Sequence, residues 1–335
     1  MYKDKTILIT GGSGSWGTEL TRQLLDQQPG KVIIFSRGEI SQVSMQRKFN
    51  DRRIEFVIGD VRDINAVEQI FQTNQIDYVF HLAALKHVPI CENQPQEAIK
   101  TNIGGTTNLI QVVLKYPVKK FIFVSTDKAV DPINVYGMTK GICERLIIQA
   151  NCCTKNTEFL CVRAGNVLGT NGSLVQHIIN QIKINNEVTI TDEKMTRYFL
   201  TQQKAIELLF FATEEGIGGE IYVMNMPSFY IKDLFKLLIT HYGNAQTGLK
   251  VVGSREGEKL HEVLISKSEV LRTKLVNDNY HVIYPQLEVG RTYSHIWDHF
   301  KDVSRIFLNG SFTSQDNIKG KDTLFNLLQE GGFLS

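Results

Sequence analysis

The amino-acid sequence predicts an α/β protein built on a doubly wound parallel sheet. Two observations predict this fold: short apolar runs alternate with helix-length segments through the first half, and a glycine-rich turn follows the first run. The runs are continuous and rich in Val, Ile and Phe, which is typical of parallel strands buried on both faces. The expected strands are Thr6–Thr10, Val32–Ser36, Glu55–Gly59, Tyr78–Leu82, Phe121–Ser125 and Phe159–Arg163.

The alternation is clearest before about residue 165 and loosens after it. We therefore expect a main domain over residues 1–165 and a smaller, interleaved α/β region over residues 166–335. The helices expected in the two parts are Pro95–Lys115 and Val135–Cys153 in the first, and Ser173–Asn185, Gln202–Glu214 and Ile231–Tyr242 in the second.

Composition excludes several classes of protein. The 335 residues are 42% hydrophobic and carry a net charge of +2 from 37 basic and 35 acidic residues, a balance that argues against a nucleic-acid binder. Apolar runs stay well short of the roughly 18–20 residues of a membrane helix, and the Ile7–Ile9 stretch is too short for a signal peptide. The odd number of cysteines, without C-x-x-C spacing, predicts a cytoplasmic protein with no disulfide framework and no metal site.

The first expected strand runs directly into a turn with glycines at 11, 14 and 17, and a helix follows. In such a turn one glycine permits a tight bend, one lets the backbone approach a pyrophosphate, and one lets the helix pack on the strand. The helix N-terminus then faces the phosphates with its partial positive charge. An ordinary loop is the alternative, but the position after the first strand predicts a Rossmann-like dinucleotide site that includes Gly11, Gly14, Ser15, Trp16 and Gly17.

The second expected strand indicates which dinucleotide binds. An NAD enzyme usually has an acid at the end of this strand, whereas this chain has Ser36 and Arg37. A hydroxyl and a guanidinium suit a 2′-phosphate, so we expect NADP, with a solvated surface arginine as the alternative. Asp60 and Val61 follow the third strand, where the adenine ring would lie, although Asp60 could instead cap a helix. Residues 1–165 are thus the expected NADP-binding domain, and residues 166–335 mainly the substrate-binding region.

Tyr136 and Lys140 are four residues apart at the start of an expected helix, which places both on one helix face. An ammonium near a phenol lowers the phenol pKa from about 10, and the phenolate can then take a proton from a substrate hydroxyl. A surface pair is the alternative reading. Ser125 and Thr126, at the end of the preceding strand, make the pattern more specific to catalysis.

Asp127 and Lys128 follow that same strand and place an acid beside a base at the carboxyl edge of the sheet, where ligands of open α/β sheets bind. A dehydrogenase or epimerase needs only the hydroxyl, the tyrosine and the lysine of the previous paragraph. An additional acid–base pair indicates further proton transfers, such as elimination and reprotonation, with a surface ion pair as the alternative.

Several motifs over residues 3–270 together resemble the inverting UDP-N-acetylglucosamine 4,6-dehydratases, which are extended short-chain dehydrogenases/reductases of pseudaminic-acid and capsule biosynthesis. The motifs include Thr10–Gly17, Gly59–Asp63, Ala83–Pro89, Lys100–Asn102, Ser125–Ala129, Pro132–Asn134 with Tyr136 and Gly137, Ile190–Asp192 with Met195–Arg197, and Gly257–Glu262. The resemblance adds Leu82, Ala83 and Val167 to the cofactor site. It implies a substrate site formed by Lys86, Ser125, Asn166, Arg197, Arg255 and Glu258.

The resemblance also implies a mechanism without net redox change. Tyr136, with Thr126 in the catalytic set, would deprotonate the C4 hydroxyl of UDP-N-acetylglucosamine while NADP+ accepts the C4 hydride. Lys128 would remove the C5 proton, Asp127 would protonate the departing C6 hydroxyl, and the hydride would return to C6. The expected product is a UDP-2-acetamido-2,6-dideoxy-4-hexulose.

Four residues depart from the family pattern: Trp16 in the glycine turn, Gly38 in place of an aspartate, Leu82 in place of an alanine, and Ala164 in place of a tyrosine. Gly38 is expected to affect cofactor affinity, and Ala164 to enlarge the sugar pocket. Family members assemble as dimers and hexamers, so the resemblance implies a homo-oligomer with Pro95–Lys115 and Val135–Cys153 as interface helices.

Two other functions stay open. A UDP-sugar 4-epimerase or another dehydrogenase of the same fold would keep Tyr136 and Lys140 but would have no use for Lys128. A non-catalytic NADP-binding sensor often lacks the tyrosine, whereas this chain fills every catalytic position.

Overall fold

The computed structural model describes residues 1–170, 172–253, 256–286 and 310–334. Its largest sheet has nine strands in this part of the chain, in the order β14-β15-β10-β6-β5-β4-β1-β2-β3. The strands from β10 to β3 are parallel, and β15 and β14 extend the sheet antiparallel. Their bounds are β1 (Thr6–Thr10), β2 (Lys31–Ser36), β3 (Ile54–Ile58), β4 (Tyr78–His81), β5 (Lys120–Thr126), β6 (Glu158–Ala164), β10 (Ile221–Met224), β14 (Thr273–Val276) and β15 (Tyr280–Ile283). The predicted α/β fold with a mainly parallel sheet is confirmed.

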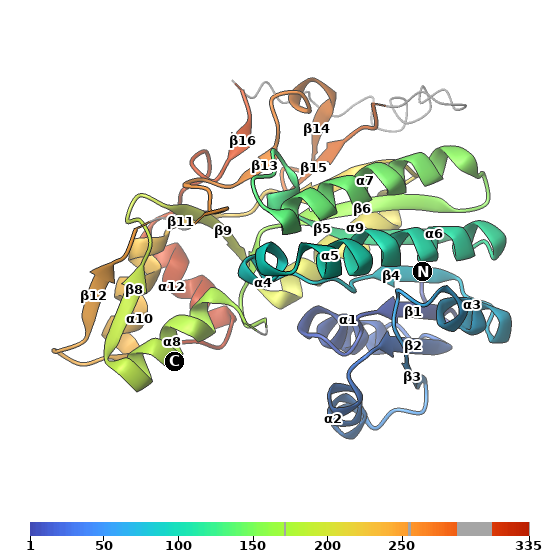
Figure 1. Cartoon of the computed structure of the whole chain (residues 1–335), viewed down its shortest axis with the longest axis horizontal. Coiled ribbons are helices and arrows are strands. Elements are labelled where there is room, and N and C mark those ends of the chain that lie inside the picture. Colours follow the sequence, from blue (N-terminus) through green and yellow to red (C-terminus); the bar gives the residue numbers. More distant parts are fainter. Residues whose placement is uncertain (171, 254–255, 287–309, 335) are drawn as a thin grey trace.

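Helices cover both faces of this sheet. Figure 1 shows α6 and α7 in front of the sheet and α9 behind it, and α9 packs beside α1. The helices of this layered part are α1 (Ser15–Asp26), α2 (Glu39–Phe49), α3 (Ile64–Thr73), α4 (Val88–Asn93), α6 (Gly105–Lys115), α7 (Val135–Cys153) and α9 (Gln202–Glu215). The bounds of α7 are those expected from the sequence. Asn134 caps this helix, since its Oδ1 accepts a hydrogen bond from the Gly137 N–H at 2.8 Å.

The helix expected over Pro95–Lys115 is instead three joined helical segments: α5 (Pro95–Ala98), a π-helical segment (Ile99–Gly104) and α6. Asn102 lies in the π-helical segment, and its side chain bonds the Leu85 N–H at 2.8 Å and the Leu85 carbonyl at 3.0 Å. It also donates to the Thr139 hydroxyl at 2.9 Å. Such local widening often marks a functional site, and here it attaches the helix to the loop after β4.

The second half of the chain divides its residues between two cores. Strand β10 is part of the large sheet, and helix α9 packs into the apolar core of that sheet. A second apolar cluster lies in the smaller lobe at the left of Figure 1. That lobe contains α8 (Leu174–Asn185), α10 (Ile231–Tyr242), α12 (Lys321–Glu330), and the paired strands β8 (Glu187–Ile190) and β12 (Gly248–Val251). The two halves of the chain are thus interleaved in space.

The remaining short strands and turns lie outside the large sheet. They are β7 (Asn166–Val167), β9 (Thr196–Leu200) and β11 (Ser228–Tyr230) in one sheet, the pair β13 (Val263–Ile265) and β16 (Phe312–Thr313), and 3-10 turns at Asp127–Ala129 and Val270–Arg272. Among the described residues, no helix is long and apolar enough to cross a membrane.

Candidate active site

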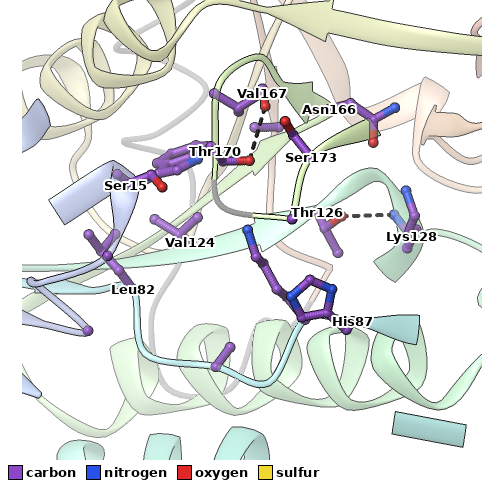
Figure 2. A pocket seen from close by; sticks show the side chains of 18 of the residues that line it. Ser15, Leu82, His87, Val124, Thr126, Lys128, Asn166, Val167, Thr170 and Ser173 are labelled. Atoms are coloured by element: carbon purple, nitrogen blue, oxygen red, sulfur yellow. Dashed lines mark hydrogen bonds between the residues drawn. The ribbon is translucent and has the colours of Figure 1, made fainter. Parts of the chain in front are cut away.

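A cavity of about 490 Å³ lies where the carboxyl ends of β1, β4, β5 and β6 face the smaller lobe. Figure 2 shows that it extends from Ser15 and Leu82 at one end to Lys128 and Asn166 at the other. The residues predicted for the site that line it are Gly11, Gly14, Ser15, Trp16, Gly17, Leu82, Ala83, Lys86, Ser125, Thr126, Lys128, Tyr136, Lys140, Asn166 and Val167. Residues from distant parts of the sequence therefore meet in one cavity.

The glycine turn forms one end of the cavity. Gly11 has φ +67°, and a Cβ there would lie 2.8 Å from the Ala83 nitrogen, so only glycine suits this position. A Cβ on Gly17 would lie 2.2 Å from the Gly12 carbonyl oxygen, so a glycine at 17 lets the first turn of α1 lie directly against the backbone of the glycine turn. A Cβ on Gly14 would instead meet only the Gly11 oxygen, at 3.2 Å. Gly14 precedes α1 and lines the cavity, so the turn fits a pyrophosphate at the helix N-terminus.

Ser36 is the last residue of β2 and Arg37 follows it, beside this turn and outside the cavity lining. The Ser36 hydroxyl lies 2.8 Å from the Ser13 hydroxyl and accepts a hydrogen bond from the Gln42 amide at 2.9 Å. The Arg37 side chain is 52% exposed, and its guanidinium lies 3.7 Å from the Asp60 carboxylate. Two hydroxyls and a half-exposed guanidinium thus lie close to the glycine turn. Ser13 and Gln42 were not predicted as members of this group.

The Asp60 carboxylate is held by Arg62, which donates from its backbone N–H at 2.9 Å and from its guanidinium at 2.8 Å. Burial opposes the charge of Asp60, but Arg62 and Arg37 outweigh it and lower the pKa of the carboxyl. Val61 is buried, and a Cβ on Gly105 would lie 2.5 Å from its side chain. In this structure Val61 packs against α6.

Tyr136 and Lys140 both line the cavity, but the Lys140 ammonium is directed to the backbone. It donates to the Val124 carbonyl at 2.5 Å and lies 4.2 Å from the centre of the Phe123 ring. Burial lowers the pKa of Lys140 to about 8. Burial also raises the pKa of Tyr136 to about 12, opposed by the charge of Lys128 and a hydrogen bond with Thr126. The charge that favours phenolate is thus that of Lys128, rather than the expected charge of Lys140.

Asp127 and Lys128 begin the 3-10 turn that follows β5. The Lys128 ammonium lies 3.0 Å from the Asp127 carboxylate and 3.2 Å from the Glu262 carboxylate. The Thr126 hydroxyl donates to the same Asp127 oxygen at 2.9 Å. Lys128 and Thr126 line the cavity, whereas Asp127 is fully buried behind them.

Burial and opposite charges act on the protonation of this cluster in different directions. Burial raises the pKa of Asp127, against the effect of Lys128, and Glu262 adds to the rise. Burial opposes the charge of Lys128, but Asp127 and Glu262 outweigh it and raise the pKa of the ammonium. The resting arrangement therefore favours a charged Lys128 beside a carboxyl that protonates readily.

Only some of the expected substrate residues line the cavity. Lys86 and Asn166 line the cavity, and so does Ser125. Arg197 is buried, donates to the carbonyls of Thr196 and Lys259, both at 2.8 Å, and lies 3.5 Å from Glu262. Glu258 is partly buried and lies outside the lining that the described residues form. Arg255 lies outside the described residues.

Two residues near the site had no assigned role in the sequence analysis. Asn102 holds the backbone of Leu85, next to Lys86, and Glu262 pairs with Lys128. Both lie inside motifs that carried the family resemblance, Lys100–Asn102 and Gly257–Glu262. The two motifs were the signal in the sequence that could have pointed to Asn102 and Glu262. Neither motif indicates which residue the side chain of Asn102 or Glu262 contacts.

Comparisons with known proteins find similarity over most of the chain. Residues 7–284 match the family described as polysaccharide biosynthesis protein. The chain is similar to an inverting UDP-N-acetylglucosamine 4,6-dehydratase from Campylobacter jejuni, with 40% identity over 292 residues, 86% of this chain and 85% of the relative. It is equally similar to a protein named UDP-glucose 4-epimerase from Rickettsia bellii, with 40% identity over 288 residues, 84% of each chain. The solved structure of Pen from Bacillus thuringiensis is 35% identical, with a TM-score of 0.90 over 100% of both chains.

Proposed function

The chain belongs to the polysaccharide biosynthesis protein family, and from this membership we propose that it is an NADP-dependent UDP-N-acetylglucosamine 4,6-dehydratase that inverts C5. The observation that carries the proposal is the position of Lys128. Its side chain lines the same cavity as Tyr136 and is paired with the buried Asp127. Removal of water needs this second acid–base pair, whereas oxidation of a hydroxyl alone does not.

Tyr136 is the base for the C4 hydroxyl, and Thr126 and Lys128 stabilise its phenolate. Lys128 takes the C5 proton once C4 is a ketone. The departing C6 hydroxyl takes a proton from Asp127, and the Thr126 hydroxyl lies between Asp127 and the cavity. A proton that moves from Lys128 to Asp127 along their 3.0 Å contact leaves an amine and a carboxylic acid, which are the two forms that elimination requires.

Gly14 and Ser15 would hold the cofactor pyrophosphate, and Ser36 and Arg37 its 2′-phosphate. Bound NADP would supply the acceptor for the C4 hydride and return that hydride to C6. Lys86, Asn166 and Ser125 line the remaining part of the cavity and are the proposed contacts of the nucleotide sugar. Arg255 and Glu258 stay predictions from the sequence, as does a direct substrate contact of Arg197.

A second candidate function is a UDP-sugar 4-epimerase, because the relative from Rickettsia bellii carries that name. The two functions differ at C5 and C6. An epimerase leaves both carbons intact, whereas a dehydratase breaks the C5–H and C6–O bonds.

The experiment that tests the proposal is incubation of the purified protein with UDP-N-acetylglucosamine and NADP in D2O. Proton NMR should show a 4-keto-6-deoxy sugar with deuterium at C5. Lys128→Ala should lose C5 exchange while NADP binding persists, and Lys194→Ala, at an exposed lysine, is the matched control. UDP-N-acetylgalactosamine as the sole product would establish the epimerase instead, and exchange that persists in Lys128→Ala would remove Lys128 as the base.

We also propose that the protein forms a homo-oligomer in the cytoplasm. The support is an apolar surface over α4, the π-helical segment and α7. Five aliphatic side chains on and beside these elements are 47–49% exposed: Ile90, Ile99, Ile133, Met138 and Ile142. A second copy that covers this surface would remove it from water. Light scattering should report at least a dimer, and Ile142→Lys should shift the assembly toward the monomer.

A further inference from the structure

Glu262 is a buried carboxylate that the proposed mechanism leaves without a role. It precedes β13 and is 2% exposed, and its Oε1 lies 3.2 Å from the Lys128 ammonium and 3.5 Å from the Arg197 guanidinium. Lys128 is therefore held between two carboxylates, one next to it in the sequence and one from a distant segment. Asp127 alone would not determine the direction in which the long lysine side chain extends.

The backbone around Glu262 is fixed on both sides. The Glu262 N–H donates to the Ser314 hydroxyl at 3.0 Å, and its carbonyl accepts from the Ser314 N–H at 2.8 Å. Two residues further on, the Leu264 carbonyl accepts from the Arg163 guanidinium at 3.0 Å, which joins β13 to β6. The carboxylate is thus presented to Lys128 by a rigid segment.

We propose that Glu262 is a positioning residue that holds the Lys128 amine at the cavity wall and, balanced by Arg197, governs when Lys128 can accept the C5 proton. This inference rests on the proposed function. Glu262 lies behind Lys128, outside the lining formed by the described residues, and so acts through Lys128. In the step itself the C5–H bond breaks, the proton passes to the Lys128 amine, and the electron pair enters the enolate of the C4 ketone.

The charged and titratable groups around Lys128 determine the sign of the effect. Asp127 and Glu262 raise the pKa of Lys128 against burial, and Arg197 lowers it. Lys259 interacts electrostatically with Asp127, Glu262 and Lys128. The phenols of Tyr136 and Tyr198 also interact with charged groups of this cluster. Loss of the Glu262 charge should therefore make Lys128 a neutral base at lower pH, and loss of the Arg197 charge should do the reverse.

The test compares Glu262→Gln and Arg197→Gln by the pH dependence of C5 deuterium exchange at saturating UDP-N-acetylglucosamine. The rising limb should move by about one to two pH units, to lower pH in Glu262→Gln and to higher pH in Arg197→Gln. In Glu262→Gln the maximal exchange rate should fall at least about tenfold because Lys128 loses its position, while KM changes little. Glu193→Gln, an exposed residue of the same kind, is the matched control and should leave the limb in place.

The outcomes separate this inference from the proposed function. A wild-type protein that makes no 4-keto-6-deoxy sugar contradicts the proposed function. An active wild type whose rising limb stays unmoved in Glu262→Gln, or moves the same way in both variants, contradicts the role of Glu262 only. If Glu262→Gln does not fold, Arg197→Gln alone tests the inference. A rising limb that does not move to higher pH in Arg197→Gln overturns it.

Discussion

The Lys140 ammonium donates a hydrogen bond to the Val124 carbonyl at 2.5 Å, so the helix that carries Tyr136 is tied to the strand that carries Thr126. A buried ammonium needs an acceptor, and the strand carbonyl provides one. The phenol consequently depends on Lys128 for a nearby positive charge. The lysine of the Tyr-x-x-x-Lys spacing therefore joins helix to strand, and Lys128 of the acid–base pair supplies the charge that acts on the phenol.

Lys140 should make stability depend on pH in a defined window. Its pKa is about 8 in the folded protein and 10.5 ordinarily, so between these values the unfolded chain binds more protons. The free energy of unfolding should therefore rise with pH across this window. Urea denaturation at pH 8 and pH 10.5 should show that the wild type gains more stability than Lys140→Met. An equal gain in both proteins would mean that Lys140 keeps an ordinary pKa.

Two glycines of the turn should separate folding from cofactor binding. Ala at position 14 meets only one atom, at 3.2 Å, so Gly14→Ala should fold normally but obstruct the pyrophosphate and weaken NADP binding at least about tenfold. Ala at position 17 collides with the Gly12 backbone, so Gly17→Ala should lose about 1–3 kcal/mol of stability or more. Thermal melts and fluorescence titration measure the two effects. Normal NADP binding by Gly14→Ala would place the phosphates elsewhere.

Arg37 should discriminate between the two nicotinamide cofactors. Its guanidinium is half exposed and only 3.7 Å from Asp60, so it can turn toward a 2′-phosphate. A hydrogen bond to a charged group contributes about 1.5–3 kcal/mol, so Arg37→Ala should weaken NADP binding roughly tenfold or more and leave NAD binding nearly unchanged. Calorimetric titration with both cofactors tests this, and equal weakening for both would argue against a 2′-phosphate contact.

Asn102 should organise the loop that presents Lys86. Its amide makes three hydrogen bonds, two of them to the Leu85 backbone, and it is 2% exposed. Asn102→Ala removes the hydrogen bonds of these partners and should lower the free energy of unfolding by about 1–3 kcal/mol. KM for the nucleotide sugar should rise because the loop loosens.

The matched control for Asn102 is Asn151→Ala, since Asn151 is also buried and bonds a backbone group, the Phe159 N–H at 3.0 Å, but lies near the C-terminal end of α7. It should leave KM unchanged. A similar rise of KM in both variants would show that the effect comes from general destabilisation rather than from the loop.

Much of the fold could be predicted because its signals are local. The bounds of β1 and α7 are those expected, since an apolar run and a capped helical pattern are properties of consecutive residues. The glycine spacing likewise indicated the turn that lines the cavity. The π-helical segment was missed because no pattern within Pro95–Lys115 indicates it; its residue Asn102 bonds Leu85, which lies in another segment of the chain.

The residues of the sequence by themselves determined the parallel sheet, the dinucleotide turn, and the presence of Tyr136, Lys128 and Asp127 at one edge. Only the tertiary structure decided that Lys140 turns to Val124 and that Glu262 meets Lys128. It also decided the protonation that each group favours. The physical reason is that burial and opposite charges from distant segments set these properties, and both arise only when the chain is packed.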